Sequence, residues 1–168
     1  MTLARQNVRC LRQGRRLIEQ LEPSLYAEKE GRGSVGAHLR HCIDYYRCFL
    51  RGLDDGRIDY DARERQPEIE TDPETGAAAL DEIMARLETL DGPAGRPLQV
   101  KVDSAAWGDP ALIWSGSTLH RELQFLLSHT VHHYALIAQH LRRRGREVSD
   151  DFGVAPSTLE HREAHVHG

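Results

Sequence analysis

Hydrophobic side chains recur every three or four residues in four separate stretches of the chain, which is the period of an amphipathic α-helix. The first stretch covers residues 3–21 and ends before Pro23, a residue that disfavours helix continuation. The second follows Ser34, a good N-cap residue, and runs to residue 53, before the turn residues 54–56. Both stretches therefore predict helices with one apolar face.

The other two stretches lie in the second half of the chain. In the third, residues 73–90, Asp72 supplies a cap and Pro73 takes the first helical position. The fourth begins at a cap supplied by Ser117 or Thr118 and runs to residue 144, before Gly145. Four amphipathic helices joined by turns predict an all-α fold, a four-helix bundle.

The remaining segments lack helical periodicity. Residues 57–71 are expected to form an ordered but irregular polar connection. Between residues 94 and 116, the runs 98–102 and 111–114 resemble short strands on either side of turn residues 107–110, so a small hairpin insertion is expected before the last helix. We expect the bundle to occupy residues 1–147, and a C-terminal extension to occupy residues 148–168 and end in mobile residues.

Length and composition narrow the class of protein. The chain has 168 residues, enough for one domain with its own core, and its formal net charge of −4 gives no support for nucleic-acid binding. No apolar run has the roughly 20 residues of a membrane span, and no signal peptide is recognisable. The three cysteines form no CxxC motif, which favours reduced thiols in a cytoplasmic protein.

Three histidines within five residues form the main candidate for chemistry. His129 and His133 are four residues apart, so they share one helix face, the face that also carries apolar side chains. A buried imidazole needs a hydrogen-bond partner or a metal ion, because leaving it unpaired costs about 1–3 kcal/mol. His132 lies about 100° around the helix from His133 and is expected beside the site or at the surface.

A third metal ligand has to come from another helix, and the group His38 and His41 is the best source, with His41 the preferred residue. Three imidazoles would leave a coordination position open for water or substrate, as in catalytic sites. Imidazole ligands suit Zn, Ni, Fe or Cu. The alternative is that these histidines are surface residues or are hydrogen-bonded separately.

Four further residues are expected near the metal because of their spacing from the histidines: Asp44, Tyr45, Cys48 and Glu122. Asp44 can orient an imidazole, and Glu122 can act as a base. For each of the four, a surface salt bridge, core packing or helix capping is the alternative role. The tail residues His161, His165 and His167 are given no function.

The pattern Ser34-x-Gly36-x-His38-x-Arg40-His41, followed by His129-x-x-His132-His133, resembles the DinB-like superfamily of metal-binding four-helix bundles. The resemblance implies that His41, His129 and His133 are the ligands of one divalent metal ion (Zn, Ni or Fe) and that the protein is a homodimer. It also implies thiol-dependent transferase chemistry, because related domains occur in thiol-dependent transferases and isomerases and in ergothioneine-forming sulfoxide synthases.

The chain departs from the superfamily pattern after His133, where Tyr134-Ala135-Leu136 replaces Arg-Gly-Gln. The segments 58–63 and 152–159 look like hallmarks of a subgroup within the superfamily.

Three hypotheses follow. The first is a metal-dependent transferase or hydrolase, in which the metal activates a low-molecular-weight thiol or water. The second is a non-catalytic metal-binding or stress-related dimer. The third is a metal-free bundle with an interaction role.

Overall fold

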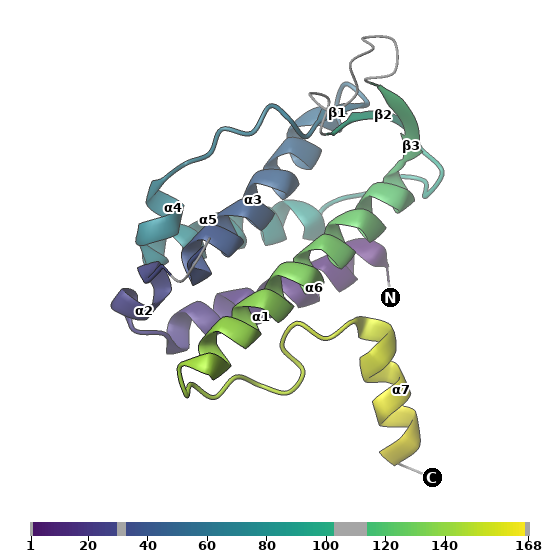
Figure 1. Ribbon diagram of the computed structural model, residues 1–168. Helices are drawn as coiled ribbons and strands as arrows, with labels where there is room; N and C mark the ends of the chain where they lie inside the picture. The colour runs from purple at the N-terminus through teal and green to yellow at the C-terminus, as the bar shows by residue number, and fades with distance from the viewer. Residues whose placement is uncertain (1, 30–32, 103–113, 167–168) are drawn as a thin grey trace.

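The computed structural model describes residues 2–29, 33–102 and 114–166 and forms a helical bundle with a small sheet at one end (Figure 1). The long helices are α1 (Leu3–Gln20), α3 (Val35–Gly52), α5 (Pro73–Glu88) and α6 (Leu119–Arg143). Helices α1 and α3 each pack against both α5 and α6, and their buried apolar side chains form one core. The predicted all-α bundle is confirmed.

Local capping sets where these helices begin. The Ser34 hydroxyl accepts a hydrogen bond from the backbone N–H of Ala37 at 3.0 Å, and Asp72 caps α5 in the same way. At the start of α6, Thr118 rather than Ser117 supplies the cap, accepting from the N–H of Arg121 at 3.2 Å. The starts predicted for these three helices are confirmed because each depends on contacts within three residues.

Two short helices, α2 (Pro23–Ala27) and α4 (Glu68–Thr71), lie outside the four predicted helices, and α4 falls within the predicted irregular connection. Tyr26 in α2 donates its hydroxyl hydrogen bond to the backbone carbonyl of Ile69 in α4 at 2.5 Å. Both side chains are fully buried. Helices of four or five residues are too short to show a hydrophobic period, and this long-range contact holds them in place.

The sheet differs from the predicted hairpin. Strand β2 (Pro97–Lys101) pairs in parallel with β1 (Arg57–Asp59) and antiparallel with β3 (Ser115–Thr118). The prediction of a second strand at residues 111–114 is wrong at Trp114, which precedes β3, while residues 111–113 and the predicted turn 107–110 lie outside the described residues. The prediction that residues 57–71 form an irregular connection is also wrong, because both β1 and α4 lie within this segment. A three-residue strand carries almost no periodic signal, so only its pairing with β2 defines it.

After α6 the chain folds back along the bundle before it reaches α7 (Pro156–Val166), which extends away from the body (Figure 1). Phe152 is buried and stacks on Tyr134 of α6, with ring centroids 4.8 Å apart and planes 8° from parallel. Helix α7 lies within the predicted C-terminal extension, and residues 167–168 lie outside the described part. Among the described helices, none has both the length and the apolar character needed to cross a lipid bilayer.

Candidate metal centre

Helices α3 and α6 bring His41 together with His129 and His133. One ring nitrogen from each of the three lies within 4.8 Å of the others. The ring centroids are 5.0 Å apart for His41 and His129, and 4.6 Å apart for each of the other two pairs. The structure therefore joins the predicted histidine pair of one helix to the histidine of another.

The two helices present these rings because of their register. The four-residue spacing of His129 and His133 places them one turn apart on α6. Leu126 and Thr130 of the same helix are fully buried, as is Ile43 beside His41 in α3. These packed side chains hold the helices together, while the three imidazoles remain half-buried.

An aromatic wall encloses one side of the histidine cluster. The Tyr45 ring lies 5.0 Å from the His41 ring and 4.5 Å from the His129 ring, measured between centroids. Phe125 stacks on His129 at 5.6 Å, and Tyr60 stacks on Tyr45 at 5.2 Å. These rings shield that side of the cluster from water.

Burial keeps the three imidazoles neutral. It is the largest cause of a fall in the pKa of His41 to about 4, with the neighbouring His129 adding to the effect. Burial, followed by the proximity of His129 and His41, lowers the pKa of His133 to about 3. The pKa of His129 is lowered mainly by burial as well. All three rings therefore offer unprotonated nitrogens at neutral pH.

The Nε2 atom of His129 is buried and has no hydrogen-bond partner among the described residues. Such an atom costs about 1–3 kcal/mol unless a ligand satisfies it. Three neutral nitrogens on rigid helices suit a metal of borderline softness such as Zn²⁺. The residues present thus fit a divalent metal ion.

His38 and His132 take outer positions. The Nδ1 atom of His38 lies 3.0 Å from the Nδ1 atom of His133, so one ring donates a hydrogen bond and the other accepts it. If His133 is the donor, its Nε2 keeps a free lone pair for a metal. His132 is exposed, with its ring 5.3 Å from that of His133.

Of the four further residues expected near the metal, Tyr45 contacts two of the three histidines directly. Asp44 is buried and accepts a hydrogen bond from Arg40 at 2.6 Å, rather than from an imidazole. Burial raises the pKa of Asp44, and the charge of Arg40 opposes that rise.

Cys48 and Glu122 contact groups other than the three histidines. The thiol of Cys48 contacts the backbone carbonyl of Ala62 at 3.8 Å, and burial raises its pKa, which keeps it protonated. Glu122 is fully buried and accepts hydrogen bonds from Tyr60 at 2.7 Å and Ser117 at 2.5 Å. These contacts do not bring the side chain of either residue against the histidine rings.

Arg63 is a residue of this region that the sequence did not single out individually. Its guanidinium carbon lies 5.2 Å above the Tyr45 ring centroid. It follows β1 in a segment without helical period, so no spacing relates it to His41 or His129. The only signal was that residues 58–63 resemble a subgroup hallmark.

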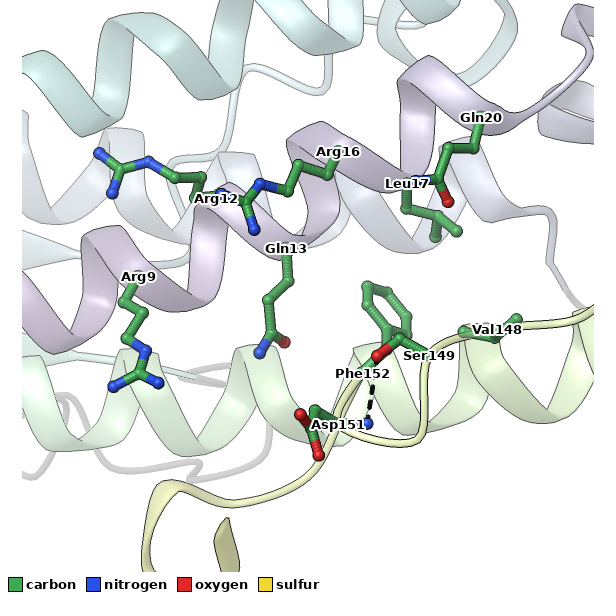
Figure 2. Close-up of a pocket in the computed structure, with 10 residues that line it drawn as sticks. All are labelled: Arg9, Arg12, Gln13, Arg16, Leu17, Gln20, Val148, Ser149, Asp151 and Phe152. Carbon is green, nitrogen blue, oxygen red and sulfur yellow. Dashed lines mark hydrogen bonds between the residues drawn. The ribbon is translucent and has the colours of Figure 1, made fainter. Parts of the chain in front are cut away.

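A separate groove of about 540 Å³ lies between α1 and the chain that follows α6 (Figure 2). Arg9, Gln13 and Arg16 of α1 line it together with Ser149 and Phe152. None of the three clustered histidines lines this groove. It is thus distinct from the candidate metal centre.

The fold and the three-histidine cluster define a helical bundle whose side chains can hold a metal ion. A family model of the DinB superfamily matches residues 6–137, and the chain belongs to this superfamily. The chain is also similar to FK506-binding protein 5 of Rhizopus delemar, with 31% identity over 109 residues, which cover 62% of this chain and 27% of that protein. The match thus spans about a quarter of that relative's length. No solved structure matches the chain.

Proposed function

We propose that the protein binds one divalent metal ion, Zn, Ni or Fe, through His41, His129 and His133, and that it acts as a thiol-dependent transferase on a small molecule. The observation that carries this proposal is the group of three neutral imidazoles with ring nitrogens within 4.8 Å, one of which is buried without a partner. Three protein ligands would leave a coordination position for substrate.

A bound divalent ion would supply Lewis acidity, lowering the pKa of a thiol or water held beside it. The chain's own residues set the conditions for that chemistry. The neutral imidazoles add no negative charge, so the site would keep the full charge of the ion. Tyr45 and Phe125 exclude water from one side, and the contact of His38 with His133 restrains the His133 ring.

A non-catalytic metal-binding or stress-related dimer is the second candidate. The observation that favours it is the engagement of the nearby acidic groups. Asp44 is bound to Arg40, and Glu122 is bound to Tyr60 and Ser117, so neither stands as a free base beside the histidines. In this case, loss of a ligand would reduce stability without removing any activity.

Elemental analysis of protein purified without a tag tests metal binding, because the histidine-rich tail and a tag both bind metals adventitiously. The wild type should carry one equivalent of metal, and His133→Ala should lose it. His132→Ala is the matched control, since this exposed neighbour lies one residue away on the same helix and should leave metal content unchanged. A wild type that takes up neither Zn, Ni nor Fe(II) would contradict the proposal.

We further propose a cytoplasmic homodimer. Three free and buried cysteines support a reducing compartment. The mass of the metal-loaded protein in solution, measured by sedimentation equilibrium, should be twice that of one chain. A mass of one chain at micromolar concentration would exclude the dimer.

A further inference from the structure

Arg63 differs from the arginines of the neighbouring helix α3. Arg40 pairs with Asp44 and Glu70, while Arg47 and Arg51 pair with Glu82 and Glu64 respectively. Within the described residues Arg63 has no carboxylate partner, and its Nε atom is buried without a hydrogen bond. A guanidinium whose donor is buried and unpaired is suited to an external acceptor.

The position of Arg63 relates it to the histidine cluster. Its guanidinium carbon lies 5.2 Å from the centroid of the Tyr45 ring. That same ring lies 4.5 Å from His129 and 5.0 Å from His41. The guanidinium and the two imidazoles therefore all lie against the same aromatic ring. Consistently, its positive charge is among the causes, after burial, that lower the pKa of both histidines.

The nearby carboxylates leave Arg63 without a direct acidic partner. The charge of Asp44 attracts Arg63, but Asp44 is hydrogen-bonded to Arg40, and Glu122 accepts a hydrogen bond from Tyr60. A divalent ion on three neutral imidazoles would add further positive charge. The planar fork of a guanidinium matches the two oxygens of a carboxylate, and the stacking on Tyr45 restricts its orientation.

We propose that Arg63 binds the carboxylate of a small anionic substrate whose other end reaches the three-histidine cluster. Arg63 is then a specificity-determining residue. The inference rests on the proposed metal-dependent function and names its substrate class: a small molecule that carries a carboxylate a few bonds from a thiol or other metal-binding group.

The test compares two thiols of equal length, mercaptopropionate and the uncharged mercaptopropanol, as ligands of the cobalt-substituted protein. The visible spectrum of cobalt reports thiol binding without any need for turnover. The wild type should bind mercaptopropionate more tightly by about tenfold, the size expected for one charge-assisted contact. In Arg63→Gln the two affinities should become nearly equal, while Arg63→Lys should recover part of the preference.

Arg121→Gln is the matched control. Arg121 also lies over an aromatic ring of the site, with its guanidinium carbon 5.3 Å from the Phe125 centroid, but it is exposed and paired with Glu122. This variant removes the same charge and should keep the preference for mercaptopropionate. Unchanged cobalt content and melting temperature in Arg63→Gln would show that metal site and fold are intact.

Failure of the two proposals would look different. A wild type that binds no metal contradicts the proposed function, and the carboxylate site is then tested on the metal-free protein by calorimetric titration with mercaptopropionate. If the metal-free wild type binds mercaptopropionate and Arg63→Gln does not, the inference is supported. If the metal-free wild type does not bind it, the inference is overturned. With metal present, an equal preference in wild type and Arg63→Gln overturns it. Stronger competition by inorganic phosphate than by acetate would overturn the carboxylate assignment.

Discussion

His133 shows how the behaviour of a residue depends on its neighbours. Its Nδ1 atom meets His38, and its ring also lies against His41 and His129. Outer hydrogen bonds of this kind orient a metal-bound imidazole and raise its basicity. His38 thus gains a role that the spacing of histidines along the chain did not assign to it.

Replacing His38 with Ala should weaken metal affinity by about 10–100-fold without abolishing binding, the usual effect of losing an outer hydrogen bond. Competition with a chelator of known affinity measures the change. His132→Ala removes an exposed imidazole that touches the same ring, and it should have little effect. Equal affinities for wild type and His38→Ala would exclude a positioning role.

The buried histidines should make the metal-free protein sensitive to acid. The pKa values of His41, about 4, and His133, about 3, lie below that of an unfolded histidine, about 6.5. The unfolded chain therefore binds more protons between these values, so stability is complete above about pH 6.5 and is lost as the pH falls through the folded values.

Urea unfolding of the metal-free protein at pH 7.5 and pH 5 should show this loss. A double variant, His41→Gln with His133→Gln, should show a weaker pH dependence, because the two groups that take up the protons are gone. An equally steep dependence in the double variant would assign the effect to other groups.

At the scale of elements, the contact between α6 and the segment after it depends on Gly153. This residue has φ of +73°, and a Cβ there would come within 2.5 Å of the backbone nitrogen of Ala135. The close approach brings Phe152 onto Tyr134, at the position where the chain departs from the superfamily pattern. Tyr134 therefore packs against Phe152, a residue that lies outside the matched region 6–137.

Gly153→Ala should destabilise the protein by more than Gly145→Ala. Gly145 has a similar φ of +69° but nothing within 4 Å of an added Cβ, so it reports backbone strain alone, about 1–2 kcal/mol. The excess at Gly153 then measures the collision with α6. Chemical denaturation gives both free energies of unfolding, and equal losses would mean that the segment moves aside at little cost.

The sequence predicted long elements better than short ones. The starts of α3, α5 and α6 follow from Ser34, Asp72 and Thr118, whose side chains cap amides two or three residues away. Strand β1 was not predicted because Ile58 pairs with Val100, which lies far along the chain. Helix α2 is held by the contact of Tyr26 with Ile69, which is equally remote.

For the whole molecule, the role of the C-terminal extension remains a prediction that truncation can test. A chain ending at residue 155 lacks only α7 and the last residues, and it should keep the melting temperature and metal content of the full protein. A chain ending at residue 147 also loses the buried Phe152 and should be destabilised by an amount close to that of Phe152→Ala, about 3–5 kcal/mol. Equal melting temperatures for both truncations would show that the Phe152 contact contributes little.

The sequence by itself determined the long helices and the pairing of His129 with His133, because capping and helical spacing act over a few residues. Superfamily resemblance selected His41 over His38. Only the tertiary structure decided that His41 reaches the pair, that His38 contacts His133, and that Arg63 lies over Tyr45. These contacts join segments far apart in the chain, and their geometry depends on how α3, α6 and the small sheet pack together.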